Sequence, residues 1–284
     1  MRRAALLILL LGCGKPQGPT GPTRAIADSR GREIRVPIPP RRIVSIVPSV
    51  TELLFTVGAG DQVAGVTTWC DTPPEAKKKP KIGSIVVNAE ALAALRPDLI
   101  VTCERITKDT TADLERRGYA VFSVDPMNFE QIAEALRLLG DVTGHADEGR
   151  RAADALLARV RAVEARVAGR AAPLVYFEQS VEPMWTTGPE SYVGDAIRRA
   201  GGRLVFDGGW KLVDWESVLA RDPEVILIPH DFREGLERRA GWKGLRAVKA
   251  GRVHFVAKDA FLYPAPRLLQ GLEEAARLLH EKNP

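Results

Sequence analysis

The 284-residue sequence has little cysteine, few histidines and no long hydrophobic run. Three cysteines exclude a disulfide-stabilised scaffold and every zinc framework that needs several cysteines. The four histidines, at positions 145, 230, 254 and 280, include no pair at the i, i+4 spacing of a zinc-binding helix. The longest apolar run, residues 4–11, is much shorter than the roughly 20 residues that cross a bilayer. The sequence is therefore not that of a polytopic membrane protein.

Signatures of common enzyme classes are also absent. The chain has no G-x-S-x-G elbow, no P-loop and no G-x-G-x-x-G turn, so the strongest markers of acyl transfer, phosphoryl transfer and dinucleotide binding are missing. Basic and acidic residues are interspersed, and a formal charge of +5 is too small an excess to indicate a nucleic-acid partner. We therefore expect neither an enzyme nor a nucleic-acid-binding protein, and no cofactor.

The N-terminus predicts export and a lipid anchor. Two arginines precede the apolar run, as in a secretory signal, and Leu10-Leu11-Gly12-Cys13 resembles a bacterial lipobox. We expect residues 1–12 to be a signal peptide, Cys13 to carry the lipid, and the Pro/Gly-rich residues 13–23 to be a tether. Loss of Arg2 and Arg3 lowers the charge from +5 to about +3. These features predict a protein anchored to a membrane on the periplasmic side of the cell envelope.

The remainder of the chain alternates short apolar strands with amphipathic helices. This alternation is typical of α/β folds with mostly parallel sheets. A proline-free stretch over 147–168 predicts the longest helix, and a Ser49–Glu52 capping box predicts the start of an earlier one. We expect two Rossmann-like lobes (24–144 and 171–284) joined by one long linking helix (145–170). Such an arrangement leaves a ligand cleft between the lobes.

Tryptophans in loops indicate what the cleft binds. Of the five tryptophans, Trp215 and Trp242 lie in predicted helices, whereas the other three stand beside turn-forming residues. Aromatic walls suit a large, flat, partly apolar ligand that a few polar groups orient. The expected ligand contacts are the loop tryptophans Trp69, Trp185 and Trp210, with polar contacts from Ser49, Asp71, Asp259 and Tyr263.

His230 supports an alternative interpretation. It follows the predicted strand 225–228, and ligands of open α/β sheets bind beyond the carboxyl ends of strands. With Asp231 it would suit a membrane-tethered α/β enzyme. A surface sensor that reports ligand occupancy to a partner is a further alternative.

Two motifs resemble the helical-backbone class of bacterial periplasmic substrate-binding proteins, which bind metal chelates such as cobalamin, siderophores and haem. They are Pro39 to Ser49 followed by Thr51-Glu52, and Asn88-Ala89-Glu90 followed by Leu95 to Ile100. The segments 69–76 and 183–188 are similar to those of the cobalamin-binding subgroup, as are Trp210 with Glu216 and Asp259 with Pro266-Arg267. Thr72, Ser84-Ile85 and Tyr263 depart from that pattern, so the same fold could hold a ferric siderophore or haem instead.

The resemblance implies a function and two docking residues. The chain would capture a corrinoid and deliver it, as a monomer, to the permease of an ABC importer. Glu90 and Glu216, one in each lobe, would meet arginines of that permease, and each is predicted near a helix start, where the dipole favours a carboxylate.

The sequence leaves open whether Cys70 and Cys103 form a disulfide. An exported protein can form one. If another strand separates the two that precede these cysteines, the strand tips lie about 9.6 Å apart, beyond the ~7 Å that a disulfide spans between Cα atoms, although loop residues could close that gap.

Overall fold

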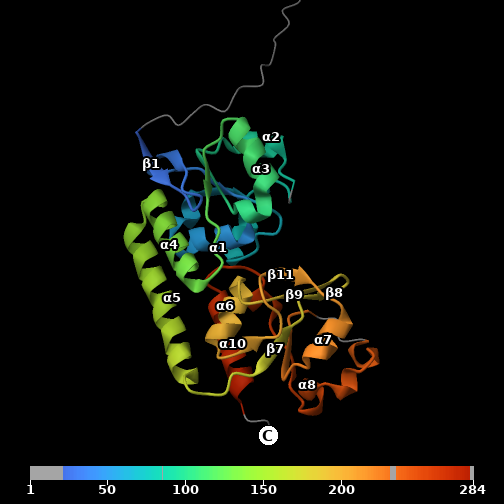
Figure 1. Ribbon diagram of the computed structural model, residues 1–284. Helices are drawn as coiled ribbons and strands as arrows, with labels where there is room; N and C mark the ends of the chain where they lie inside the picture. Colours follow the sequence, from blue (N-terminus) through green and yellow to red (C-terminus); the bar gives the residue numbers. More distant parts are fainter. Residues whose placement is uncertain (1–21, 85, 231–234, 282–284) are drawn as a thin grey trace, which may run out of the picture.

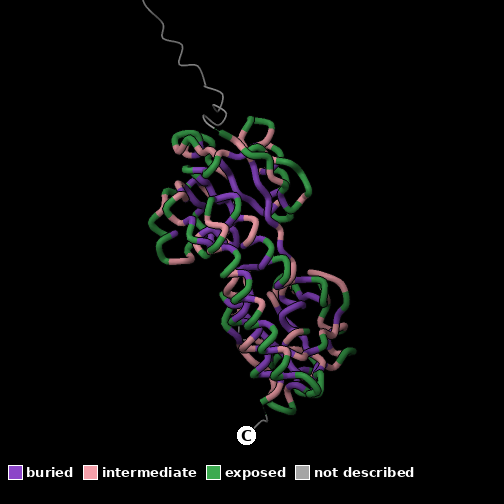
Figure 2. Tube along the Cα trace, turned by 90° about the vertical axis from the view of Figure 1, so that its left-hand side faces the viewer, coloured by how far each residue is buried: buried purple, intermediate pink, exposed green. Residues whose placement is uncertain are grey.

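The computed structural model describes residues 22–84, 86–230 and 235–281, and it contains two α/β lobes stacked end to end (Figure 1). Figure 2 shows buried residues inside both lobes and across the waist between them. One long helix, α5 (Ala146–Val167), runs along one side of the molecule from the first lobe to the second (Figure 1). The expected α/β fold with two lobes and one long helix is confirmed.

The N-terminal lobe is built on a four-stranded parallel sheet with the order β4-β3-β5-β6. Its strands are continuous apolar runs, as is usual for parallel strands that helices cover on both faces. The strands are β3 (Ile43–Ser45), β4 (Val63–Val66), β5 (Leu99–Thr102) and β6 (Val121–Ser123). The helices are α1 (Pro48–Thr56), α2 (Ala89–Leu95) and α3 (Glu104–Arg116), with 3₁₀ turns η1 (Ala59–Gln62) and η2 (Pro74–Lys78). A β-hairpin precedes them, formed by β1 (Thr23–Ala27) and β2 (Glu33–Pro37).

The C-terminal lobe repeats the plan with the order β10-β7-β12-β13, again parallel. The strands are β7 (Leu174–Phe177), β10 (Arg203–Leu204), β12 (Val225–Ile228) and β13 (Val253–Phe255). The helices are α6 (Tyr192–Arg199), α7 (Trp215–Arg221), α8 (Arg246–Lys249), α9 (Lys258–Phe261) and α10 (Leu268–His280), with η3 (Leu236–Arg238) and η4 (Trp242–Gly244). In both lobes the first strand is central and the second lies at the edge.

A second, antiparallel sheet in this lobe was missed by the sequence reasoning. It consists of β8 (Ser180–Val181), β9 (Met184–Thr187) and β11 (Trp210–Leu212), in the order β11-β9-β8. In Figure 1 it covers the end of the lobe that faces the N-terminal lobe. The prediction that Trp185 and Trp210 lie in loops is therefore wrong, because both belong to these short strands.

The long helix pairs with α4 (Phe129–Thr143) through two glycines. A Cβ atom at Gly149 would lie 2.6 Å from the carbonyl oxygen of Leu136 and 3.0 Å from the Cα atom of Gly140. The two backbones can approach this closely only because neither glycine has a side chain. Gly144 ends α4 in the left-handed conformation with φ of 83°.

Two polar ties connect the lobes directly. The carboxylate of Glu52 in α1 accepts hydrogen bonds from the backbone N–H of Arg267, at 2.9 Å, and from its guanidinium. The predicted capping box is wrong, because α1 begins at Pro48 after the extended residue Val47, with no side-chain cap. Proline has no N–H at this first position to be satisfied, so Glu52 is available to the other lobe.

The second tie centres on Asp195 of α6, whose side chain is 6% exposed. Its carboxylate accepts from the backbone N–H of Phe129, the first residue of α4, at 3.1 Å, and pairs with Arg199. The guanidinium of Arg199 also reaches Glu130 of α4 and Glu164 of α5. Both ties are largely shielded from water, which strengthens their electrostatic interaction.

We predict that Arg267→Ala loosens the contact between the lobes. It leaves the Glu52 carboxylate, 10% exposed, without its cation, so the free energy of unfolding should fall by about 3 kcal/mol. Amide exchange should accelerate in α1 and in the first turn of α10. Denaturant unfolding and hydrogen exchange measure both effects.

The control is Arg159→Ala, which breaks the more exposed pair with Glu273 and should cost less than about 1 kcal/mol. Equal losses in the two variants would contradict a special role for the Glu52–Arg267 tie.

Candidate functional site

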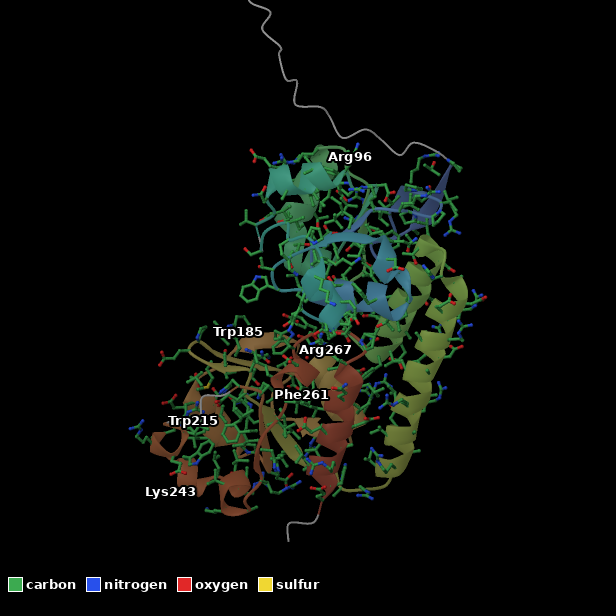
Figure 3. All side chains as sticks on the ribbon, turned by 180° about the vertical axis from the view of Figure 1, so that it is seen from behind. Arg96, Trp185, Trp215, Lys243, Phe261 and Arg267 are labelled. Atoms are coloured by element: carbon green, nitrogen blue, oxygen red, sulfur yellow. The ribbon has the colours of Figure 1, made fainter. Side chains whose placement is uncertain are left out.

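The candidate site lies where the carboxyl ends of the two parallel sheets face one another. In the first lobe, Trp69 and Asp71 follow β4 and Cys103 follows β5; in the second, Tyr263 and Arg267 lie between β13 and α10. Arg267 is seen at the boundary between the lobes in Figure 3. Ligands of open α/β sheets bind beyond the carboxyl ends of strands, so both lobes offer that edge to the same space.

An exposed apolar row on the antiparallel sheet covers the second lobe. Trp185 of β9 and Leu212 of β11 are Cα partners across the sheet, and 37% and 58% of their surface is exposed. Figure 3 shows Trp185 at the edge of its lobe, toward the first lobe. Large apolar residues left in water in this way mark interaction surfaces when they lie together. Leu212 was missed by the sequence reasoning, although its cross-strand register with Trp185 follows once β9 and β11 are recognised as paired.

Trp210 lies two residues before Leu212 on β11, and it joins this sheet to the rest of the lobe. It is half-buried, and its ring packs edge-on against Phe177, at 6.4 Å between centroids, and against Tyr192 at 5.8 Å. Phe177 in turn contacts Phe261 at 5.5 Å. The Tyr192 hydroxyl donates to the carbonyl oxygen of Leu262 at 2.9 Å. This aromatic cluster packs the antiparallel sheet against the end of β7.

On the first lobe, Trp69 is the corresponding exposed aromatic residue, with 60% of its surface accessible. The next residue, Cys70, is buried, and its sulfur lies 3.1 Å from the Thr67 hydroxyl. Asp71 is exposed. The turn is thus anchored by Cys70 and presents the indole and the carboxylate on either side of it.

Electrostatics indicates that residues of the two lobes approach one another. Burial raises the pKa of the Tyr263 hydroxyl, and the carboxylate of Asp71 in the other lobe raises it further, while Arg267 opposes them. Asp259, exposed on α9, acts in the same direction as Asp71. Among the described residues discussed for this site, Asp71 and Asp259 supply carboxylates, and the guanidinium of Arg267 is bound to Glu52.

Ser49 does not reach this surface in the structure. It lies in the first turn of α1 and is 1% exposed. The proline start of α1 turns Ser49 into the core instead of leaving it as a cap.

Cys70 and Cys103 are free thiols. The strand β3 does lie between β4 and β5, so the two cysteines follow strands that are not neighbours. Cys103 donates to the carboxylate of Asp125 at 3.0 Å, whereas Cys70 contacts Thr67. The disulfide that the sequence left open is not formed here.

Glu90 and Glu216 occupy equivalent places in the two lobes. Each is the second residue of a seven-residue helix, α2 or α7, and each is exposed. The side chains of Asn88 and Asp214 cap these helices by accepting from the backbone N–H three residues later. The dipole of each helix start favours the carboxylate.

His230 belongs to a buried charged cluster. Its Nε2 atom lies 3.2 Å from the carboxylate of Glu178, which also binds the guanidinium of Arg239 at 2.5 and 2.9 Å. Burial alone would raise the pKa of Glu178, but His230 and Arg239 outweigh it and hold this pKa below the ordinary value of 4.5. Asp231 and Cys13 lie outside the described residues.

Among residues 22–84, 86–230 and 235–281, no group of three or more His, Cys, Asp or Glu side chains is placed to hold a metal ion. Within the same ranges, no helix has the length and apolar character needed to cross a membrane.

Comparison with known proteins identifies relatives over most of the chain. Residues 43–260 match the family model described as periplasmic binding protein. An uncharacterized ABC transporter substrate-binding lipoprotein of Bacillus subtilis, YvrC, is 28% identical over 98% of this chain and 96% of its own length. A vitamin B12-binding protein of Salmonella typhimurium is 30% identical over 85% of this chain and 91% of its own.

Solved structures share the fold. The periplasmic vitamin B12-binding protein BtuF of Vibrio cholerae superposes with a TM-score of 0.76 at 23% identity, covering 85% of this chain and 97% of its own. A periplasmic haem-binding protein of Pseudomonas aeruginosa reaches a TM-score of 0.72 at 25% identity, with 85% and 93% coverage. The fold is thus common to proteins with different ligands.

We predict that Glu178→Gln removes a pH-dependent part of the stability. Because the folded-state pKa of Glu178 is lowered, its contribution is complete above the unfolded value and is lost as the pH falls through the folded one. The stability of the wild type should therefore exceed that of the variant most at pH 6 to 7, and this difference in stability should shrink below about pH 4.5. Thermal unfolding from pH 3 to 7 measures this.

The control is Glu190→Gln, which removes an exposed carboxylate and should leave the pH dependence of thermal unfolding unchanged. A difference between wild type and Glu178→Gln that grows on acidification would contradict the assignment.

Proposed function

The chain belongs to the periplasmic binding protein family, and from this membership we propose that it captures cobalamin between its lobes and delivers it to an ABC importer. Members of this family are periplasmic substrate-binding components of transport systems, not enzymes, and they carry ligands instead of catalytic cofactors. The predictions of no enzymatic activity and no cofactor are confirmed on that basis, and the tethered enzyme with His230 and Asp231 is set aside.

The observation that carries the choice of ligand is the pair of exposed apolar surfaces at the facing ends of the lobes. Trp69 on one side, and Trp185 with Leu212 on the other, are large apolar side chains left in water. A flat macrocycle with apolar faces would cover them and remove that surface from solvent. Trp210 would hold the second surface in place through Phe177 and Tyr192.

The charges favour a corrinoid over the alternatives. The rim of a corrinoid carries amide groups, whose N–H donors suit the carboxylates of Asp71 and Asp259. Haem propionates and the anionic groups of ferric siderophores require cations, and the guanidinium of Arg267 is already bound to Glu52. The vitamin B12-binding relative of Salmonella typhimurium supports the same choice, whereas the haem-binding protein of Pseudomonas aeruginosa keeps haem as the second candidate.

Delivery would use the carboxylates of Glu90 and Glu216. Both are exposed, both occupy the second position of a capped helix, and one comes from each lobe. A permease with two arginines at matching positions would bind both lobes at once. Since one chain supplies both halves of the ligand site and both docking groups, we propose that it acts as a monomer, without a nucleic-acid partner.

The anchor would be lipid on Cys13, with residues 1–12 removed as a signal peptide and 13–23 acting as a tether. The relative YvrC of Bacillus subtilis is named a lipoprotein, which supports this assignment. The protein would then remain near the permease after each delivery.

We predict that Trp185→Ala weakens cyanocobalamin binding by roughly 5- to 30-fold, since it removes one aromatic contact of about 1–2 kcal/mol. Titration calorimetry with cyanocobalamin, haem and a ferric siderophore measures affinity and selectivity together. The matched control is Trp215→Phe on the flank of the second lobe, which should bind as wild type (Figure 3).

Absence of cyanocobalamin binding at micromolar protein would overturn the proposed ligand. Tighter binding of haem or of the siderophore than of cyanocobalamin would identify that chelate as the ligand instead.

We also predict little lobe movement on binding. The two polar ties and the α4–α5 pairing resist a hinge, so the radius of gyration should change by less than about 1 Å when cyanocobalamin binds. Small-angle scattering of free and loaded protein tests this. A compaction of several ångströms would show that the ties break during capture.

A further inference from the structure

The helices that carry the two docking carboxylates are copies of one local design. An Asx cap precedes each helix, a buried apolar residue, Leu92 or Val218, occupies its fourth position, and a left-handed residue, Arg96 or Asp222, ends it. A proline and an acidic residue then lead into β5 or β12. The two segments therefore correspond residue by residue, with Glu90 equivalent to Glu216.

The copies differ at the first helical position, which is Trp215 in α7 and Ala89 in α2. The Trp215 ring packs against Trp242 at 5.8 Å between centroids, and the guanidinium of Arg239 lies 4.9 Å from it. Its indole N–H donates to the carbonyl oxygen of Ala240 at 2.7 Å. In the second lobe this indole fills the space between α7 and the following segment.

In the first lobe the same space is open. A groove of about 320 Å³ lies between α2 and α3, which are neighbours in Figure 1. Leu92 and Leu114 are buried at its base, whereas 80% of Val86 is exposed. Its apolar lining consists of Val86, Val87, Ala89, Leu92, Leu114 and Tyr119. The equivalent tryptophan shows that an indole suits this position in the fold.

The charged residues that line the groove are Asp109, Asp113 and Arg117. Glu90 follows Ala89 on α2, and Asp109 of α3 lines the groove. Both are exposed, and neither forms an ion pair with another of the described residues. Asp113, also in the lining, pairs with Arg116 and Arg117. A partner that buries an apolar side chain here and places a cation beside it would satisfy both the apolar lining and the free carboxylates.

We propose that this groove is a socket for an aromatic or branched apolar side chain of the permease, which stands next to the cation that pairs with Glu90. The proposal rests on the proposed delivery to an importer and adds an apolar anchor to it. The occupant takes the place that Trp215 fills in the other lobe. Docking is thereby asymmetric: the first lobe receives a side chain, and the second offers a surface that is already filled.

A peptide titration tests the socket without the permease or the ligand. The probe is acetyl-Trp-Arg-amide, observed through the methyl groups of the ¹³C-labelled protein, with acetyl-Ala-Arg-amide as the matched probe. We expect shift changes at Val86, Val87 and Leu92, and binding at least about tenfold weaker for the alanine peptide. Ala89→Trp, which fills the groove from within, should abolish these changes and raise the melting temperature. Ala89→Ser leaves the groove open and should bind as wild type.

Absence of shifts in the wild type, or equal shifts in Ala89→Trp, would overturn the proposal. The melting temperature and the methyl spectrum show whether the tryptophan variant is folded. If the tryptophan variant misfolds, Ala89→Leu replaces it, since leucine fills the groove less fully. This variant must then bind the tryptophan peptide more weakly than wild type for the proposal to hold.

An uptake assay tests whether transport depends on the socket. The native host carrying Ala89→Trp should import labelled cyanocobalamin at least about tenfold more slowly, although the purified variant binds it as wild type. Ala89→Ser should import within about twofold of wild type, and import by Glu90→Gln should be impaired.

Normal uptake by Ala89→Trp together with impaired uptake by Glu90→Gln would refute the socket and keep the docking carboxylate. Normal uptake by both would refute docking at this helix. If the wild type imports no cyanocobalamin, the proposed ligand fails and the peptide titration decides on the socket.

Discussion

The ion pair between Glu52 and Arg267 sets the geometry on which the rest of the molecule depends. It joins residues 215 positions apart and ties the first helix of one lobe to the start of the last helix of the other. Because both side chains are shielded from water, neither can leave its partner without a large desolvation cost. With the Asp195–Phe129 tie and the glycine contact of α4 with α5, it keeps the carboxyl ends of the two sheets face to face.

That constraint explains where the exposed aromatic residues stand. The ends of parallel strands are where α/β lobes bind ligands, and here two such ends share one space. The antiparallel sheet adds a flat apolar surface to the second lobe, while a single turn adds Trp69 and Asp71 to the first. Each lobe supplies only part of the proposed contact surface, which is complete only when the two lobes are in place.

The two lobes follow one plan but differ in one local surface. Their strand orders match, and α2 and α7 share caps, buried positions and left-handed ends. One of the differences between these helices, Ala89 against Trp215, accompanies a groove on the first lobe and a filled surface on the second. A repeated scaffold can thus keep two exposed carboxylates, Glu90 and Glu216, in equivalent positions and still present two different surfaces.

The sequence by itself determined the α/β class, the long helix and the helix starts at Glu90 and Glu216, because periodicity, capping residues and the absence of proline act locally. It also singled out the exposed Trp69 from its turn-forming neighbours. Tertiary structure decided what depends on distant partners: Glu52 binds Arg267 in the other lobe instead of capping its own helix, Trp185 and Trp210 pair as strands, and Ser49 is buried. The missed strands β8, β9 and β11 have two to four residues and lack the continuous apolar run that marks a parallel strand such as β12. A carboxylate selects its partner only once folding has brought the cations within reach.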